Sequence, residues 1–354
     1  MKKSLLALAA LTAFAGAASA QSSVTLFGLI DLSVNNIKNG SQSQKLLSSN
    51  QLASNRLGFR GVEDLGGGLR AGFWLEGGMT NDDGNPGGQN WQRRSTVSLI
   101  GGFGEIRLGR DYTPTFWNHT VFDPFGTNGV GSQTNLMVAQ NATSGANGTQ
   151  VFDGGAATLV RASNSVGYFL PALGGVYGQV MVAAGENAPA TAGNKYIGGR
   201  IGYAGGPVNV AVAYGKTEIT SNRDQVGLNV GFSFNLGFMT LLAQGHRYEV
   251  DITPALNRKQ TNLMVGATVP FGASTLKASY GRATSDGLDR DGNQIAVGYQ
   301  YDLSKRTAIY ATAARVKNEG NATNGARFTV GSGPTLQARG QTSSGYNLGV
   351  RHSF

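Results

Sequence analysis

Hydrophobic and polar residues alternate with a period of two along most of this chain. In the stretch from Gln225 to Phe234, every second residue is large and apolar, and the residues between them are small or polar. Such a period predicts β-strands that present one apolar face and one polar face. The stretch from Ser343 to Phe354 alternates in the same way, and a tilted strand needs about ten residues to cross a bilayer. The pattern therefore predicts strands that cross a membrane.

Short turns and long connections alternate between the predicted strands. Short turns, most of them containing Gly or Pro, join strands into hairpins, and longer segments rich in Asn, Asp and Gly join one hairpin to the next. Transmembrane β-barrels have short turns at one rim and long loops at the other, and an even number of strands. Our count is sixteen strands. The short turns are predicted at 63–68, 101–104, 171–175, 204–207, 235–237, 270–273 and 303–306, and the long connections at 79–92, 186–195, 249–259, 285–293 and 317–340.

The N-terminus has the three parts of a secretory signal. Lys2 and Lys3 form the basic region, an apolar stretch follows, and an A-x-A cleavage site ends at Ala20. We therefore expect residues 1–20 to be a signal peptide and residues 21–354 to form the barrel domain. No other segment approaches the roughly 18 uninterrupted apolar residues of a membrane-spanning helix. A membrane protein of this kind must cross as a closed sheet, because lipid offers no partner to an open strand edge.

The composition fits a barrel with a hydrated interior. The chain has 54 glycines, 9 prolines, 40% hydrophobic residues and a mean hydropathy of −0.16, which is polar for a membrane protein, as expected if only alternate residues face lipid. Cysteine is absent, so neither disulfides nor thiolate metal sites are available. A soluble β-sandwich is the alternative fold, but it would leave many apolar strand faces without a core to cover them.

The expected mature chain has a basic net charge. The formal charge of +9 falls to +7 once Lys2 and Lys3 leave with the signal. Such an excess serves solubility or a basic channel lining, whereas nucleic-acid binding does not suit an exported chain.

One connection is much longer than the others. After Pro114 no strand pattern appears until Arg161, and loops of such length inside compact domains are usually functional. The segment contains Phe116, Trp117 and the run from Phe122 to Gly126, which is too apolar for a loop that extends into water. We expect this loop to fold into the barrel lumen.

Seven short runs, each weak alone, form a specific pattern through their order and spacing. They are Ser23–Gly28, Arg56–Gly66, Gly101–Gly104, Arg107–Arg110, Asn164–Val166, Leu303–Thr307 and Val350–Phe354. Together they resemble the trimeric general porins of Gram-negative bacteria, of the beta-proteobacterial type, over essentially the whole mature chain. The resemblance implies an all-β fold, a transmembrane antiparallel β-barrel of sixteen strands with an inward-folded third loop. It also implies a homotrimer in the outer membrane, in contact with lipid and lipopolysaccharide.

The resemblance further implies a constriction in which acidic residues of the third loop face a ladder of basic residues on the wall. The alternation of the second strand supports this for Arg56 and Arg60, which lie on the face opposite Leu57 and Phe59. The same parity holds for Arg161 on the sixth strand. On the fourth strand Arg93 and Arg94 are adjacent, so the sequence leaves open which of them faces the lumen. For each arginine the alternative is a pairing or snorkelling role at a rim. The expected ladder is Arg56, Arg60, Arg94 and Arg161, and the expected loop acids are Asp123 and Asp153.

The function expected from these features is electrostatic filtering. Charged side chains that line a narrow wet pore bias which ions enter it, and a basic lining favours anions. We expect a general diffusion pore that passes small hydrophilic solutes and ions with an anion preference. The alternative is a substrate-selective channel for a sugar or organic anion, with Trp74, Trp91 and Trp117 as binding surfaces. A structural or adhesive surface protein is a third possibility.

The sequence gives no signal of an enzyme, a cofactor or a metal site. The three histidines, His119, His246 and His352, are far apart and show no H-x-x-x-H spacing. His246 is expected to face the lumen beside Gln244 as a polar lining residue. We therefore expect no catalytic residues, no cofactor and no nucleic-acid partner.

Overall fold

The structure is a computed structural model of the chain. It describes residues 23–354 apart from 85–89, 138–156, 186–194, 221–222, 254–255, 287–289, 322–324, 332, 335 and 337. The expected signal peptide, residues 1–20, lies outside the described residues.

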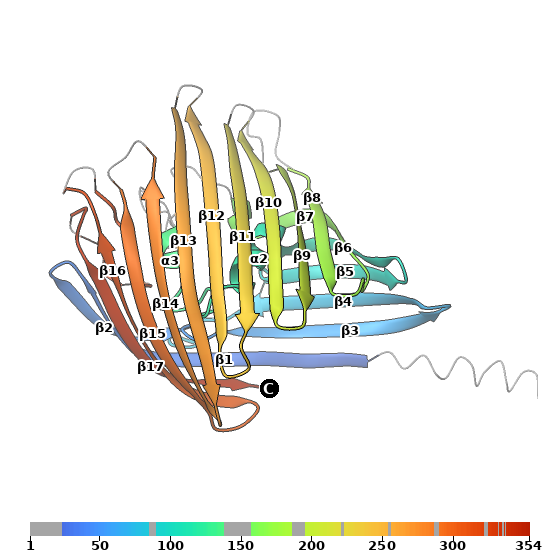
Figure 1. Cartoon of the computed structure of the whole chain (residues 1–354). Helices are drawn as coiled ribbons and strands as arrows, with labels where there is room; N and C mark the ends of the chain where they lie inside the picture. Colours follow the sequence, from blue (N-terminus) through green and yellow to red (C-terminus); the bar gives the residue numbers. More distant parts are fainter. Residues whose placement is uncertain are drawn as a thin grey trace, which may run out of the picture.

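The strands form one antiparallel sheet that closes on itself (Figure 1). At the seam, β1 pairs with β17, from Leu29 opposite Ser353 to Asn39 opposite Ser343. On its other edge, β1 pairs with β3 over its first part and with β2 over its second part. The strands are β1 Ser23–Asn39, β2 Gln42–Ser49, β3 Arg56–Gly66, β4 Leu69–Gly78, β5 Arg94–Gly101, β6 Gly104–Tyr112, β7 Arg161–Phe169, β8 Val176–Ala183, β9 Lys195–Gly205, β10 Val208–Thr220, β11 Arg223–Asn235, β12 Thr240–Thr253, β13 Leu256–Phe271, β14 Ser274–Ser285, β15 Gly292–Asp302, β16 Thr307–Asn318 and β17 Ser343–Ser353.

β2 and β3 together make one wall strand with an interruption at residues 50–55. The buried carboxylate of Asp31 on β1 fills this interruption. It accepts hydrogen bonds from the backbone N–H groups of Leu52 and Ala53, at 2.6 and 2.7 Å, and one from the hydroxyl of Tyr310 on β16. The seventeen strands therefore form a wall of sixteen, which confirms the predicted barrel and its strand count.

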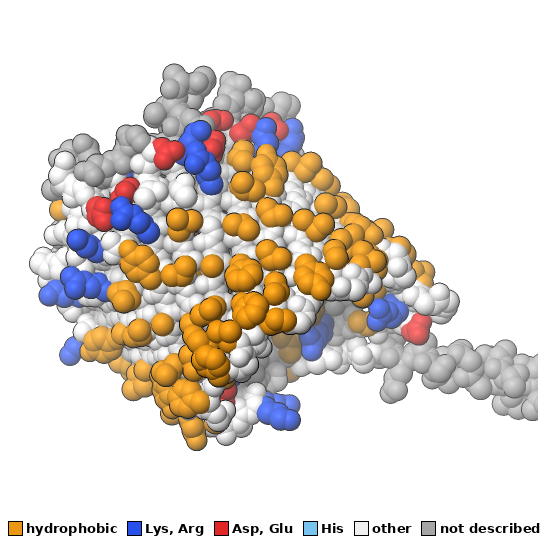
Figure 2. Space-filling model, viewed as in Figure 1, with side chains coloured by type: hydrophobic (Ala, Val, Ile, Leu, Met, Phe, Trp, Pro, Cys, Tyr) orange, Lys and Arg blue, Asp and Glu red, His pale blue; other side chains and the backbone are white. Residues whose placement is uncertain are grey.

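The outer surface of the barrel is apolar, as the alternation predicts. On β11, Leu228, Val230 and Phe232 are 47%, 51% and 40% exposed, whereas the intervening Asn229 is buried. Figure 2 shows such side chains as a broad hydrophobic band across the strands, with charged residues mainly at the rims. None of the helices among the described residues is long and apolar enough to cross a membrane.

The connections mostly follow the prediction. Each predicted short turn lies where two consecutive strands meet. The long connection expected over 249–259 is wrong, because β12 runs to Thr253 and β13 already begins at Leu256. Those residues continue the ladder between the two strands, with Glu249 opposite Lys259. Their charges resemble those of a loop because the strands extend past the apolar band to the rim.

The third loop, which joins β6 to β7, folds inside the barrel (Figure 1). Its described part contains the helices α2 Pro114–Val121 and α3 Thr134–Met137 and the 3₁₀ turn η1 Ala157–Leu159. Glycines on the inner wall make room for it. A Cβ at Gly231 would lie 1.9 Å from the Phe122 ring, and one at Gly281 would lie 2.1 Å from the Gln133 side chain. The inward fold expected for this loop is confirmed.

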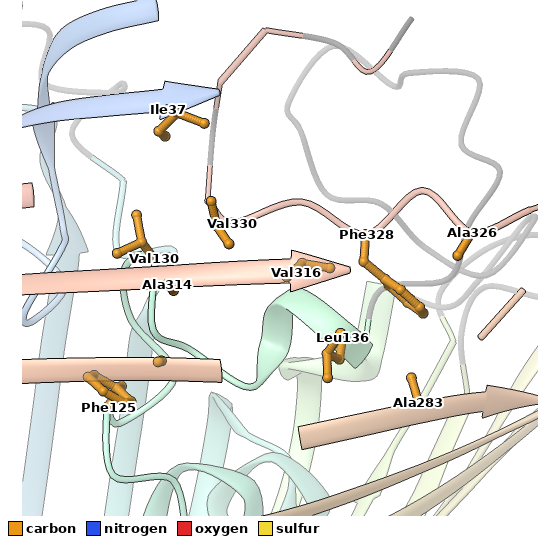
Figure 3. Packing of buried hydrophobic residues seen from close by; sticks show 11 residues of the cluster. Ile37, Phe125, Val130, Leu136, Ala283, Ala314, Val316, Ala326, Phe328 and Val330 are labelled. Carbon is orange, nitrogen blue, oxygen red and sulfur yellow. The ribbon is translucent and has the colours of Figure 1, made fainter. Parts of the chain in front are cut away.

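A second segment also folds inward, although the sequence pattern predicted only a long connection there. The connection between β16 and β17 places Phe328 and Val330 in the barrel, where they pack with Ile37 of β1 and with Val130 and Leu136 of the third loop (Figure 3). The backbone N–H of Gly331 donates to Asn135 Oδ1 at 3.2 Å. Two loops thus narrow the lumen from the same end and support each other.

Candidate functional site

Basic side chains gather on the inner faces of neighbouring strands from β3 to β7. In the register of the sheet, Arg60 on β3 lies beside Trp74 on β4, and Glu76 on β4 lies beside Arg94 on β5. Residues directly opposite in adjacent strands share a face, so these four side chains all point into the lumen. We call the following set the basic arc: Arg56, Arg60, Arg93, Arg94, Arg107 and Arg161.

Glu76 is the carboxylate that holds Arg56 and Arg93 of the basic arc. Its Oε1 lies 2.6 Å from Arg93 Nε and 3.6 Å from Arg56 Nη1, and its Oε2 accepts a hydrogen bond of 3.1 Å from the Trp74 indole N–H. The Glu76 side chain is only 8% exposed. A buried carboxylate with charged partners fixes those partners more firmly than a surface ion pair does, so Glu76 positions two arginines at once.

Asp111 does the same on β6. Its carboxylate accepts from Arg107 Nη1 and lies 3.8 Å from Arg94 Nε. Arg107 is held from its other side by Glu105, whose Oε1 is 2.9 Å from Arg107 Nε and also accepts from the Ser98 hydroxyl. Six guanidinium groups therefore face three carboxylates, which leaves three positive charges uncompensated along the basic arc.

Arg60 is the most open member of the basic arc. It has no carboxylate within 4.0 Å among the described residues, and its guanidinium lies over the rings of Phe27 and Trp74, at 5.4 and 5.1 Å from their centroids. Arg94 covers the same Trp74 ring at 4.5 Å. Such stacking holds a guanidinium while leaving its N–H groups free. A cavity of about 400 Å³ is lined by Arg60, Trp74, Arg94, Glu105 and Arg107.

Arg161 is linked to the basic arc through Tyr112, a contact that the alternation did not indicate. The pairing of β6 with β7 shifts between Gly109 and Asp111, beside the left-handed residue Asn164, so Asp111 is opposite Ala162. The alternation of inward and outward residues counted back from Val166 and Tyr168 is therefore interrupted before it reaches Arg161. Its Nη2 nevertheless donates to the Tyr112 hydroxyl at 2.9 Å, and Arg93 Nη2 donates to the same oxygen at 3.2 Å.

The third loop lies against the inner wall formed by later strands. Asn118 Nδ2 donates to Asn229 Oδ1 on β11 at 2.8 Å, Gln133 Nε2 donates to the Ser279 hydroxyl on β14 at 3.1 Å, and the carbonyl of Leu136 accepts from Gln260 on β13 at 2.6 Å. The loop is therefore anchored on a part of the wall that is distinct from the basic arc. At its near end, the rings of Phe116 and Trp117 contact the Tyr112 ring at 5.1 and 5.2 Å.

Asp123, one of the two expected loop acids, points into its own loop. Its carboxylate accepts from the backbone N–H groups of Phe125, Thr127 and Gln133, at 2.9, 3.1 and 3.0 Å, and the residue is 5% exposed. Burial raises the pKa of the Asp123 carboxyl above its ordinary value in spite of these three donors. The geometry gives it a part in the fold of the loop, and its part in ion preference stays a prediction. Asp153 lies outside the described residues.

The three tryptophans do not form one surface. Trp74 belongs to the basic arc, and Trp117 on α2 lies beside Arg200 of β9, whose Cζ is 5.5 Å from its ring centroid. Trp91 packs edge-on against Phe59 at 6.0 Å, on the face opposite Arg60. Trp74 and Trp117 therefore each support a guanidinium group, whereas Trp91 does not.

Several residues of the site were not among the sequence candidates. Alternation from Trp74 was sufficient to place Glu76 on the inner face, and alternation from Leu108 was sufficient for Arg107. Nothing in the sequence indicated that Glu76 would hold two arginines, or that His119 of the third loop would meet His246 of β12, with 2.9 Å between Nδ1 and Nε2.

The chain is similar to known proteins over its whole length. A family model for Gram-negative porins matches residues 7–321. Outer membrane porin protein 32 of Delftia acidovorans is 38% identical over 365 residues, with 100% of both chains covered. An outer membrane porin of Bordetella pertussis is 30% identical over 381 residues, covering 90% of this chain and 95% of that protein.

Solved structures agree with the sequence similarity. The structure of an anion-selective porin from Comamonas acidovorans matches with a TM-score of 0.81 at 34% identity, covering 94% of this chain and 100% of the other. OmpT, an outer membrane protein of Vibrio cholerae, matches with a TM-score of 0.66 at 14% identity, covering 95% and 99%. The second match concerns the fold alone.

Proposed function

The chain belongs to the family of Gram-negative porins, and on this premise we propose that it is a general diffusion pore that prefers anions. It lies in the outer membrane as a β-barrel, as its relatives do. The similar porin from Comamonas acidovorans is anion-selective. The single observation in this chain that carries the proposal is the basic arc, in which six guanidinium groups face three carboxylates.

The mechanism follows from where the uncompensated charge lies. Permeating ions cross a water-filled bore between the basic arc and the anchored third loop. Two unit charges about 7 Å apart interact by about 0.6 kcal/mol in water, and by more where low-dielectric walls focus the field. Three net positive charges therefore raise the local anion concentration and lower that of cations. No bond is made or broken, and the solute passes without turnover.

The carboxylates give the arginines fixed positions. Glu76 and Asp111 hold Arg56, Arg93, Arg94 and Arg107 by ion pairs, whereas Arg60 is held by aromatic rings. An ion passing Arg60 therefore meets a guanidinium whose N–H groups are unoccupied by protein acids among the described residues. We assign Arg60 the largest single contribution to anion preference.

Reversal potentials in a salt gradient across a planar bilayer test this proposal. We expect a clear anion preference at about 0.1 M salt that weakens towards 1 M, because the screening length falls from about 10 Å to about 3 Å. A marked cation preference at low salt would reject the proposal. Swelling of liposomes by uncharged solutes of increasing size tests general diffusion, since a channel selective for one solute class would saturate or be blocked by that solute.

Arg60→Gln is the variant that tests the assigned residue. We expect the anion-to-cation permeability ratio to fall about threefold at about 0.1 M salt. Arg247→Gln is the matched control, because Arg247 is an outer-face residue that pairs with Glu249 and Asp286. Equal effects of the two changes would show that only the total charge of the protein matters.

We further propose that residues 1–20 are removed as a signal peptide and that three copies assemble, in contact with lipid and lipopolysaccharide. N-terminal sequencing of the exported protein and light scattering in detergent test the first two points. The apolar band on the outer face supports contact with lipid. We also propose that the protein has no catalytic activity, since it belongs to a family of porins; hydrolysis assays on liposomes that contain it test this.

A further inference from the structure

Two histidines that are far apart in the sequence meet where the third loop touches the wall. His119 on α2 and His246 on β12 lie with Nδ1 and Nε2 2.9 Å apart. Gln244 Oε1 is 2.8 Å from the first nitrogen and 2.6 Å from the second. Both imidazoles are buried, at 1% and 4% exposure. This pair plays no part in the ion path described above.

The burial of the two imidazoles favours the state in which both rings are neutral. A hydrogen bond between two imidazole nitrogens requires one N–H and one lone pair. A further proton on the remote nitrogen of the donating ring would leave that bond intact but would place a positive charge in a buried site. His119 Nε2 and His246 Nδ1 have no hydrogen-bond partner among the described residues, so neither could disperse that charge. Burial lowers the pKa of His119 to about 4.

The surroundings of the pair contain no counter-charge among the described residues. The titratable groups nearest to it are Tyr248 on β12, whose ring stacks with that of His246 at 6.1 Å, and Tyr196 on β9, which lies near Tyr248. Arg200 on β9 lies over the neighbouring Trp117 and would oppose protonation. Asp123, in the same loop, is engaged by three backbone N–H groups of that loop.

The helix α2 connects the pair to the basic arc. Phe116 contacts His119 on one side, with ring centroids 6.3 Å apart, and stacks on Tyr112 on the other, at 5.1 Å. The Tyr112 hydroxyl accepts from both Arg161 and Arg93. A shift of α2 away from the wall would therefore change the support of two arginines. The bond from Asn118 of α2 to Asn229 of β11 is between neutral groups, and the loop carboxylate of Asp123 interacts with Lys277 of β14.

We propose that the His119–His246 pair is an acid-sensitive latch that holds α2 against the wall and releases it into the bore when an imidazole is protonated. The wall lies behind α2, so a released helix can move only towards the lumen. Release should therefore lower the mean current, and the loss of support for Arg161 and Arg93 should weaken anion preference. The second half of the loop, around α3, should stay in place.

The pH range follows from the pKa of His119 in the two states. A released imidazole has an ordinary pKa of about 6.5, and in the latched state the pKa is about 4. The latched state is therefore fully favoured above about pH 6.5 and loses stability as the pH falls towards 4. The difference of about 2.5 units corresponds to a change of about 300-fold in the equilibrium between the two states.

Hydrogen exchange of the folded protein in detergent tests the latch without reference to selectivity. After correction for the intrinsic effect of pH on exchange, we expect peptides that cover 114–121 to lose protection between pH 6.5 and 4, while those that cover 134–137 keep it. Unchanged protection of α2 would overturn the latch even if the pore proves to be anion-selective. Loss of protection together with an absent anion preference would leave the latch standing and would reject the proposed function.

Variants assign the effect to the pair. His119→Gln and His246→Gln should each abolish the pH-dependent change in protection and in single-channel current. His352→Gln is the matched control, because His352 is exposed and bonds only Thr307 among the described residues; it should behave as the wild type does. Asp123→Asn should also keep the transition. A transition that survives both substitutions of the pair, or that disappears with Asp123→Asn, would overturn the assignment.

Discussion

Replacement of Glu76 by glutamine removes one negative charge from the bore and keeps the shape of the side chain. In the native protein the carboxylate lies 2.6 Å from Arg93 Nε, 3.6 Å from Arg56 Nη1 and 3.1 Å from the Trp74 indole nitrogen. The amide oxygen of glutamine can still accept from Arg93. The change therefore raises the net charge of the basic arc from three to four with little change in its geometry.

The size of the effect follows from Coulomb's law with screening. A unit charge about 7 Å from a permeating ion contributes about 0.6 kcal/mol in water. At about 0.1 M salt the screening length of about 10 Å reduces this to about 0.3 kcal/mol, and at about 1 M almost nothing remains. Because the change favours anions and disfavours cations equally, the permeability ratio should rise about threefold at the lower salt concentration and by less than about 1.3-fold at the higher.

Reversal potentials measured at both salt concentrations provide the assay. Glu249→Gln is the matched control, since Glu249 loses the same charge at the rim, where it pairs with Arg247 and Lys259 on the exposed face. We expect no change in the permeability ratio for this control. A ratio that is unchanged in Glu76→Gln at about 0.1 M salt, or one that moves towards cations, would refute the view that uncompensated charge in the basic arc sets ion preference.

Three further substitutions probe what holds the pore in shape. Gly231→Val should displace the third loop, because even a Cβ there would lie 1.9 Å from the Phe122 ring; single-channel conductance should change while circular dichroism still shows a folded β-sheet. Phe328→Ala removes a fully buried ring and should destabilise the two inward loops by about 3–5 kcal/mol, seen as faster proteolysis of the β16–β17 connection in the folded protein. Tyr310→Phe removes the hydroxyl that donates to Asp31 and should cost about 1–3 kcal/mol, measured as a lower urea midpoint for barrel unfolding.

The wall of the barrel could be predicted from the sequence because lipid imposes the period. Each outward residue must be apolar whatever its neighbours are, so Leu228, Val230 and Phe232 mark β11 without any knowledge of its partners. The same rule places Arg56 and Arg60 on the inner face. It does not depend on long-range contacts, and for that reason it gave the strand count and the hairpin turns.

The rule fails where the alternation is interrupted. Arg93 precedes β5 and Arg94 begins it, and both reach carboxylates of the basic arc, one through Glu76 and the other through Asp111. At the first residue of a strand there is too little alternation to tell which of two adjacent arginines faces the lumen. The shift in pairing beside Asn164 has the same effect on β7, where counting alternate residues no longer tells which face Arg161 occupies.

Contacts inside the lumen follow no sequence period, but glycines at inward positions of the wall indicate where they occur. Gly231, Gly266, Gly281 and Gly298 all occupy inward positions, on β11, β13, β14 and β15. A Cβ at these positions would lie 1.9, 2.6, 2.1 and 2.8 Å from the side chains of Phe122, Pro124, Gln133 and Phe125 of the third loop. An inner wall exposed only to water has no such need of glycine, whereas a wall against which a loop packs does. A set of inward glycines on neighbouring strands therefore predicts where an inward loop lies, and Gly292 and Gly345, which face Phe328 and Val330, extend the same reasoning to the second inward segment.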